Sequence, residues 1–291
     1  MSSQHDIGIF GGDLRQVYIA ESLLSKGYRV TTYCIAESVS HKNCRTAHTL
    51  NELFESCTIL LGPIPMSRDQ ITVQAITAPS DLSIAHIAYL LKDHHTLIAG
   101  NIPSSITELC DSKHIINYDL MKNERIAILN AVATAEGTIM EAINGSDRNL
   151  HGSNCLVLGY GRCAKILAQK LKAMDAFVTV AARSEEALAY AGAAGHQPVL
   201  LSNIKFILPT FHFIFNTIPS LILNKDYLDL VDKHVSIIDI SSAPGGVDFG
   251  YAKQLNLYAK LCLGLPGKVS PRTSADILVT EINTFIKERS D

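Results

Sequence analysis

The stretch that decides the fold is Cys155-Leu156-Val157-Leu158-Gly159-Tyr160-Gly161-Arg162-Cys163-Ala164. It begins as an apolar strand and continues as a G-x-G-x-x-A motif, and the spacing of apolar residues over Cys163–Ala173 predicts a helix directly after it. In this pattern Gly159 allows the tight turn, Gly161 lets the backbone approach a pyrophosphate, and Ala164 lets the helix pack closely on the strand. The N–H groups at the start of such a helix favour phosphate. The stretch predicts a dinucleotide-binding Rossmann unit, with an ordinary strand-to-helix turn as the alternative.

The second strand of this unit indicates which dinucleotide is bound. Phe177–Ala181 is followed by Ala182-Arg183-Ser184, and the first acidic residue is Glu185. A fold that prefers NAD usually places Asp or Glu at this strand end, to bind the ribose 2′-hydroxyl. Arg183 stands where a guanidinium would meet a 2′-phosphate, and Ser184 adds a hydroxyl donor. We therefore expect NADP as the cofactor; a solvent-facing Arg183 is the alternative, and Arg162 contacts either the pyrophosphate or only solvent.

Two later strand ends belong to the same predicted site. Asn216-Thr217-Ile218-Pro219 ends one strand, and Asp239-Ile240-Ser241-Ser242-Ala243-Pro244-Gly245-Gly246 ends the next. In open α/β sheets, ligands bind beyond the carboxyl ends of the strands. Asn216, Thr217, Ile218 and Pro219 are expected on the nicotinamide ribose side, and Asp239 or Ser241 near the nicotinamide. The alternative is turn chemistry, because Asn, Ser, Pro and Gly also form simple loops.

The rest of the chain repeats the alternation of short apolar runs with longer amphipathic ones. This order predicts parallel sheets with helical crossovers, and hence an α/β fold of two doubly wound, Rossmann-like domains. We expect a first α/β domain over 1–121, a long connecting helix over 122–146 and the NADP-binding domain over 147–270. The helix predicted within 271–291 is expected to return to the first domain. Further strands are predicted at Asp6–Phe10, Tyr28–Tyr33, Cys57–Gly62, His95–Ala99, His114–Asn117, Phe213–Asn216, Ser236–Ile240 and Tyr258–Leu261.

The first domain offers candidate substrate ligands. Gly11-Gly12-Asp13-Leu14-Arg15-Gln16 follows a strand and opens a helix, but it lacks the full dinucleotide spacing. Asp13 and Arg15 could receive an anion such as a carboxylate; alternatively Asp13 only caps the helix and Arg15 lies on the surface.

Three other features are open to two interpretations. The segment 134–138, which includes Thr134, places small and hydroxyl residues in the connecting helix, either to admit a ligand or to let helices pack. The segment 264–271 is rich in glycine and proline, which predicts a rigid loop near the domain junction. Lys268 and Arg272 either supply positive charge to a cleft or are two exposed cations.

Composition excludes several classes of protein. The net charge is -3, with no basic stripe that would suit a nucleic acid. The seven cysteines form no C-x-x-C pair, so we expect reduced, buried thiols and no metal site. No stretch reads as a secretory leader or as the ~20 apolar residues needed to cross a bilayer. We expect a cytoplasmic protein without a membrane segment.

Several of these motifs occur together, in order, in one known family. After Gly11-Gly12 come Asp13-Leu14-Arg15-Gln16, Glu136-Gly137-Thr138-Ile139-Met140, Ala182-Arg183-Ser184, Asn216-Thr217-Ile218-Pro219, Pro244-Gly245-Gly246 and Gly264-Leu265-Pro266-Gly267. As an ordered set over nearly the whole chain, they resemble the family formed by the A subunits of dipicolinate synthase. The resemblance implies an oxidoreductase that converts dihydrodipicolinate, or its hydroxylated tetrahydro precursor, to pyridine-2,6-dicarboxylate. It also implies a flavoprotein-like partner, the B subunit of dipicolinate synthase, together with expression in the mother cell of a sporulating bacterium, and we expect an oligomer.

This chemistry suggests roles for a few side chains. Oxidation of a dihydropyridine removes a hydride, which NADP can accept, and a proton. Arginine recognises carboxylates by paired hydrogen bonds, so Arg15 and Arg272 are expected on opposite sides of a cleft. Glu136 and Asp239 are the candidates for a base.

Two other functions remain possible. One is a two-domain dehydrogenase of the 2-hydroxyacid or alanine type, although no His follows His234 to act as the late acid/base of the 2-hydroxyacid enzymes. The other is a non-catalytic, NADP-binding regulatory subunit.

Overall fold

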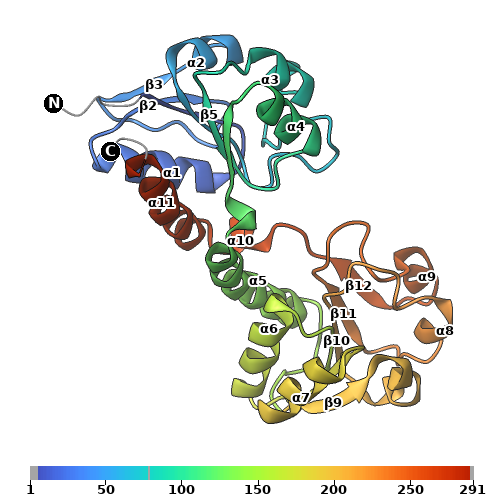
Figure 1. Cartoon of the computed structure of the whole chain (residues 1–291). Coiled ribbons are helices and arrows are strands. Elements are labelled where there is room, and N and C mark those ends of the chain that lie inside the picture. The colour runs from blue at the N-terminus through green and yellow to red at the C-terminus, as the bar shows by residue number, and fades with distance from the viewer. Residues whose placement is uncertain (1–5, 78, 289–291) are drawn as a thin grey trace. The chain divides into compact units, whose positions relative to one another are not determined.

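The computed structural model describes residues 6–77 and 79–288, and the chain divides into two compact units. The first unit comprises Met1–Ala127 together with Ser270–Asp291, and the second comprises Ile128–Val269. Figure 1 shows both units as sheets flanked by helices.

The first unit is an open parallel sheet of six strands. Its order is β3-β2-β1-β4-β5-β6, and every pairing is parallel. Apolar clusters cover both faces of the sheet, as continuous apolar strands in a parallel sheet require. Its elements are β1 (Asp6–Phe10), α1 (Leu14–Ser25), β2 (Arg29–Tyr33), β3 (Cys44–Thr46), α2 (Leu50–Ser56), β4 (Ile59–Leu61), α3 (Ile84–Leu90), β5 (Thr96–Ala99), α4 (Ser104–Ser112), β6 (Ile116–Asp119) and the 3₁₀ turn η1 (Leu120–Lys122).

The C-terminal helix α11 (Pro271–Lys287) returns to the first unit and packs against α1 (Figure 1). Its apolar stripe, which includes Leu278 and Ile282, joins the core cluster on one face of the sheet. Tyr118 at the end of the sheet donates a 2.7 Å hydrogen bond to Glu281 and stacks on Phe285. The predicted return of this helix is therefore confirmed.

The second unit repeats the same topology. Its sheet has the order β12-β11-β10-β7-β8-β9, all parallel, so in both units the chain starts at the centre, fills one half and then fills the other. Its elements after the helix α5 (Glu124–Asn144) are β7 (Asn154–Leu158), α6 (Arg162–Ala173), β8 (Phe177–Ala182), α7 (Glu185–Ala193), β9 (Gln197–Leu200), η2 (Leu201–Phe206), η3 (Leu208–Thr210), β10 (Phe213–Asn216), α8 (Lys225–Leu228), β11 (Ser236–Asp239), α9 (Phe249–Gln254), β12 (Tyr258–Leu261) and α10 (Leu265–Val269). The predicted fold class of two doubly wound α/β domains is confirmed; the short edge strands β3 and β9 were not predicted.

The helix α5 (Glu124–Asn144) is unbroken, and the small residues in it serve helix packing. A Cβ built at Gly137 would lie 3.0 Å from Leu265 Cβ and 3.1 Å from Val269 Cγ2, so the missing side chain makes room for α10. The prediction of a loop over 264–271 is wrong for this reason, because packing on α5 stabilises a short helix there. The buried Thr138 bonds back to the Thr134 carbonyl, so its hydroxyl is satisfied within the helix.

Among the described residues, α5 is long and apolar enough to cross a membrane by length and composition. The expectation that no stretch reaches that length was therefore wrong. Half of its apolar window is buried within the protein, which also fits a core helix of a soluble protein.

Candidate functional site

The turn after β7 has the geometry that the motif predicts. Gly159 adopts φ +94°, which L-residues rarely adopt, and its amide donates to the Ala181 carbonyl at 2.8 Å. A Cβ built there would lie 2.5 Å from Thr217 Oγ1. Gly159 is thus required by the fold itself, because the turn has to pass close to the end of β10.

Gly161 is different, because the protein does not need a glycine there. Its φ is -80°, and a Cβ built on it would meet nothing within 4 Å. It is the N-cap of α6 and supplies no side-chain hydrogen bond to the first turn, so no capping side chain stands between that turn and an incoming anion. Ala164 is fully buried where α6 crosses the sheet. The open space at Gly161 and the helix start without a side-chain cap fit a phosphate group.

Hydrogen bonds tie the end of β10 to the loop of β7. Thr217 contacts the Leu158 carbonyl through both its amide, at 3.1 Å, and its hydroxyl, at 2.8 Å. Asn216 is fully buried; its amide group donates to the Ile218 carbonyl at 3.0 Å, and its Oδ1 accepts from the Ile218 amide. Thr217 and Ile218 are half-buried and Pro219 is exposed, so these three lie at the surface of the predicted ribose side.

Asp239, one of the two predicted bases, is fully buried and holds the next strand end in shape. One carboxylate oxygen accepts from the Ser241 amide at 2.9 Å and the Ser241 hydroxyl at 2.7 Å, and the other accepts from the Gly246 amide at 2.7 Å. Ser241 is itself 4% exposed. Both residues therefore organise the 240–246 loop in this structure, and sequence reasoning alone did not distinguish that role from contact with a ligand.

Arg183 and Ser184 follow β8, next to the Gly159 turn. Arg183 is exposed and forms no ion pair with any residue that the structure describes. Ser184 caps α7, accepting from the Ala187 amide at 3.4 Å. The first acids, Glu185 and Glu186, lie in the first turn of α7, where they favour the helix dipole.

Three further candidates of the second unit lie on α5 and at the start of α6. Thr134 bonds to the Asn130 carbonyl and contacts the half-buried thiol of Cys163, whose pKa is raised by burial. Glu136 pairs with Lys170 at 2.9 Å, two turns along α6 from its start, so its carboxylate lies away from the Gly159 turn.

In the first unit, Asp13 and Arg15 bind each other. Asp13 caps α1 through the Arg15 amide, and the Arg15 guanidinium makes two further bonds to its carboxylate, at 2.9 and 2.8 Å. Arg15 also donates to the Ile64 carbonyl and is only 5% exposed, so the prediction of a surface Arg15 is wrong and the predicted cap is confirmed. Burial opposes ionisation of Asp13, but the hydrogen bonds and charge of Arg15 outweigh it and lower its pKa.

The turn at Gly11 and Gly12 is covered by another part of the first unit. The Gly12 amide donates to the Gln74 carbonyl, and a Cβ built at Gly11 would lie 2.8 Å from that same oxygen. The 73–75 segment thus occupies the space beside this turn that a ligand would need.

The two candidate cations near the C-terminus, Lys268 and Arg272, belong to different units. Lys268 is exposed on α10 of the second unit. Arg272 belongs to the first unit, where it pairs with Glu21 at 3.3 Å and stacks on Tyr18 at 4.1 Å. The expectation that Arg15 and Arg272 come from opposite sides of a cleft is wrong, because the return of α11 puts both in the first unit.

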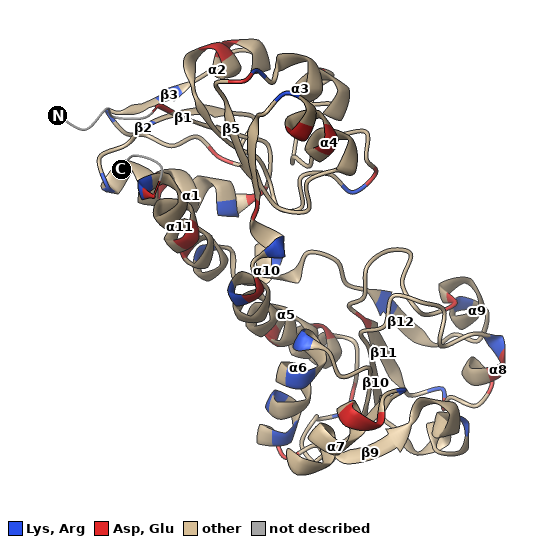
Figure 2. Ribbon diagram, in the orientation of Figure 1, with Lys and Arg blue, Asp and Glu red and all other residues tan. Residues whose placement is uncertain are grey.

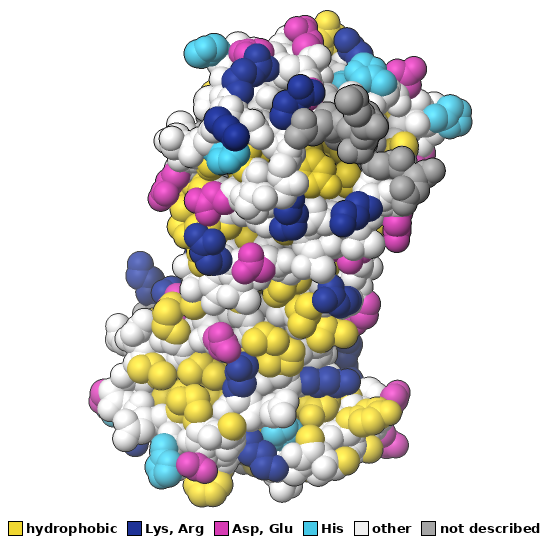
Figure 3. All heavy atoms as spheres, turned by 90° about the vertical axis from the view of Figure 1, so that its left-hand side faces the viewer, with side chains coloured by type: hydrophobic (Ala, Val, Ile, Leu, Met, Phe, Trp, Pro, Cys, Tyr) yellow, Lys and Arg dark blue, Asp and Glu magenta, His cyan; other side chains and the backbone are white. Residues whose placement is uncertain are grey.

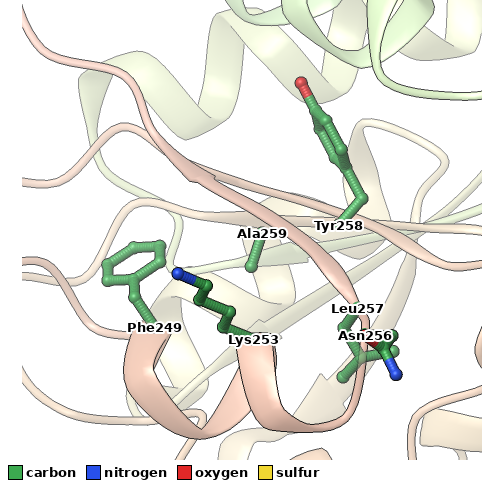
Figure 4. A pocket seen from close by; sticks show the side chains of 6 residues that line it. All are labelled: Phe249, Lys253, Asn256, Leu257, Tyr258 and Ala259. Atoms are coloured by element: carbon green, nitrogen blue, oxygen red, sulfur yellow. The ribbon is translucent and has the colours of Figure 1, made fainter.

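A shallow hollow of about 480 Å³ lies at the edge of the second sheet, beside α9 and the start of the edge strand β12. It is lined by Phe249, Lys253, Asn256, Leu257, Tyr258 and Ala259. Figure 4 shows Tyr258 pointing away from Leu257 and Asn256, so these side chains do not converge on one point. In the described residues, no group of three His, Cys, Asp or Glu side chains is arranged to hold a metal ion.

Comparison with known proteins places this geometry in a family. The family model for the N-terminal domain of the dipicolinate synthase A subunit matches residues 6–121. The dipicolinate synthase A subunit of Bacillus subtilis (strain 168) is 30% identical over 287 residues, which cover 97% of this chain and 96% of the relative. The chain belongs to the family of dipicolinate synthase A subunits.

Solved structures agree with this membership. The crystal structure of the dipicolinate synthase A subunit from Bacillus halodurans matches with a TM-score of 0.87 and 30% identity, over 98% of both chains. A transhydrogenase from Sinorhizobium meliloti matches with a TM-score of 0.66 and 13% identity, over 96% of this chain and 94% of that one. An L-alanine dehydrogenase matches with a TM-score of 0.63 and 11% identity, over 97% and 88%. At such identities the last two show the fold alone.

Proposed function

We propose that this chain is the nucleotide-binding oxidoreductase subunit of a dipicolinate synthase, and that NADP binds at the Gly159–Ala164 turn of the second unit. Family membership supports an oxidoreductase-like subunit, and the open space at Gly161 is the observation that supports the nucleotide site. A glycine that the fold does not need is explained by a ligand that comes close to the backbone.

The residues at this edge fit the parts of a dinucleotide. The start of α6 would hold the pyrophosphate, with Arg162 beside it, and the half-buried Thr217 and Ile218 would line the ribose on the nicotinamide side. When bound, the nicotinamide supplies the hydride acceptor for oxidation of the dihydropyridine ring. The buried bonds of Asn216 and Asp239 fix both neighbouring loops before a ligand arrives, which lowers the ordering cost of binding.

Arg183 supports NADP over NAD. It is the first charged side chain after β8, it is exposed, and it has no acidic partner among the described residues. A guanidinium in this position can make paired hydrogen bonds to a 2′-phosphate, whereas NAD would offer it only hydroxyls.

The substrate and the partner follow from the family. We propose that dihydrodipicolinate loses a hydride to NADP and a proton to a base, which yields pyridine-2,6-dicarboxylate. If the hydroxylated tetrahydro precursor is the molecule that binds, it loses one water to become the dihydropyridine before this oxidation. A flavoprotein-like B subunit would complete the enzyme in the cytoplasm of the mother cell. In this proposal Asp239 is a positioning residue, and Glu136 is given no chemical step, because their carboxylates are engaged by Gly246 and Lys170.

Titration of the purified chain with NADPH and NADH tests this proposal. Wild-type protein should bind NADPH more tightly than NADH, and Arg183→Ala should weaken NADPH binding by roughly tenfold or more while leaving NADH binding nearly unchanged, since a charge-assisted bond contributes about 1.5–3 kcal/mol. Arg148→Ala is the matched control. Arg148 is an exposed arginine of the same unit, and it precedes the start of β7, whereas the Gly159 turn follows the end of that strand. If neither nucleotide binds, the proposed site is wrong; if both bind equally, only the preference for NADP is wrong.

A further inference from the structure

The second unit has another hollow, which shares only Tyr160 with the proposed nucleotide site. It lies between α6 and α7, has a volume of about 450 Å³, and is called the α6–α7 hollow below. Small-molecule sites typically measure ~300–1,000 Å³, so its size is sufficient for a ligand. It is lined by Tyr160, Lys165, Ile166, Gln169, Lys172, Tyr190, Ala194 and His196.

The charge of the α6–α7 hollow is positive. The helix α6 carries Arg162, Lys165, Lys170 and Lys172 and no acidic residue, and Figure 2 shows this basic helix in the second unit. Two of the four, Lys165 and Lys172, line the hollow. Figure 3 shows the side of the molecule on which α6 lies in Figure 1, and there basic side chains lie among exposed apolar ones and some acidic ones. A ligand in this environment would carry negative charge.

The walls of the hollow are also aromatic. The Lys165 ammonium lies 5.7 Å from the centre of the Tyr160 ring and 5.4 Å from that of Tyr190. Tyr190 is 60% exposed, so its ring is accessible to a ligand from solvent. His196 meets Tyr160 edge to face at 6.2 Å. Aromatic faces beside ammonium groups favour a flat ligand that combines a π-system with anionic groups.

The His196 ring provides an independent sign that this wall is incomplete. The residue is 6% exposed, and its Nδ1 is buried without a hydrogen-bond partner among the described residues. Burial and the nearby Lys172 charge lower the pKa of His196, so the ring is neutral near pH 7 and does not repel Lys165 and Lys172. Buried polar atoms are almost always satisfied in folded proteins.

We propose that the α6–α7 hollow binds a small, planar aromatic dicarboxylate. Lys165 and Lys172 are seven residues apart on α6, which separates their backbone positions by about 10 Å along the helix axis, and their long side chains can converge on two carboxylates of one ring. The Tyr160 and Tyr190 rings would stack on the ligand. Tyr160 also belongs to the Gly159–Gly161 turn, so ligand in the hollow would restrain that turn and change the affinity for nucleotide.

The competing explanation is structural. Lys172 donates to the Ala194 carbonyl at 2.9 Å, which caps the end of α7, and Lys165 could simply rest on two rings. A structural role would appear in stability, whereas a ligand role would appear in binding. For this reason the test uses Lys165 and Tyr190, and not Lys172.

The experiment is isothermal titration calorimetry of the full chain with pyridine-2,6-dicarboxylate, in buffer without divalent cations. This choice of probe rests on the proposed function, since the probe is the product that the function implies. The variants are Lys165→Met and Tyr190→Leu, and the control is Lys170→Met, which removes a lysine of the same helix that pairs with Glu136 outside the hollow. Thermal unfolding of each variant shows that it is folded.

Saturable binding should weaken by about tenfold in Lys165→Met and more than threefold in Tyr190→Leu, and stay within about twofold of wild type in Lys170→Met. It should persist with saturating NADPH, with a changed Kd. Absent binding, equal affinity in Lys165→Met and Lys170→Met, or complete displacement of the probe by NADPH would each overturn the proposal. Titrations without nucleotide keep the two proposals separate, because the hollow can bind the probe even if NADPH does not bind the chain.

Discussion

The substitution Gly161→Ala adds one methyl group and should change nucleotide affinity much more than it changes the stability of the fold. In Gly161→Ala the new Cβ meets no protein atom within 4 Å, and the backbone angle φ of -80° suits alanine. Alanine is a poorer N-cap than glycine, so we expect the unfolding free energy to fall by at most about 1 kcal/mol. For a unit of this size, that lowers the Tm by about 2–4 °C.

The effect on the nucleotide should be much larger. The Cβ would stand where the pyrophosphate approaches the start of α6, and it would disturb N–H contacts to the phosphates. Each hydrogen bond to a charged group contributes about 1.5–3 kcal/mol, so the loss of one such bond predicts NADPH binding weaker by roughly 10- to 150-fold.

Fluorescence of NADPH provides the assay, and the chain has no tryptophan that would add background. Two other glycines serve as controls. Gly152→Ala places alanine at φ +70° in open space, so it should lower the Tm without changing NADPH affinity. Gly159→Ala combines φ +94° with a Cβ 2.5 Å from Thr217 Oγ1, so it should lower both. If Gly161→Ala binds NADPH within twofold of wild type, the pyrophosphate does not lie at this turn, and the reasoning is refuted.

Two further predictions concern the carboxylates of Asp239 and Asp13. Asp239→Asn would place an NH2 group against the Gly246 amide or the Ser241 donors, and it should lower the unfolding free energy by roughly 1–3 kcal/mol, measured by guanidinium denaturation. An unchanged denaturation midpoint together with lost turnover would instead support the hypothesis that Asp239 is a base. Asp13 has a lowered pKa in the folded chain. Its ionised form therefore stabilises the fold at pH values above the unfolded pKa of about 3.9, and this stabilisation is lost as the pH falls through the lower pKa of the folded state. Denaturation at several pH values should therefore show the greatest advantage of wild type over Asp13→Asn above about pH 5 and a shrinking one below about pH 4; a difference independent of pH would contradict the Arg15 pairing.

The sequence by itself determined the parts of the protein that depend on neighbouring residues. Apolar runs such as Phe213–Asn216 and the spacing of Cys163–Ala173 predicted strands and helices near their true bounds, because side-chain period is a local property of the backbone. The turn at Gly159 was predictable for the same reason, since its shape depends on a few consecutive residues. Alternation of strands and helices was then sufficient to predict two parallel sheets.

Only the tertiary structure decided which side chains meet. The sequence could not show that both carboxylate oxygens of Asp239 accept hydrogen bonds from the loop that follows it. Nor could it show that Arg15 donates to Asp13 and to the Ile64 carbonyl. It missed α10, whose conformation depends on a gap at Gly137, 128 positions before Leu265 (265 − 137) in the chain. The α6–α7 hollow likewise exists only because two crossover helices lie side by side. Burial, pairing and cavities depend on contacts between residues far apart in the sequence, and local patterns do not encode them.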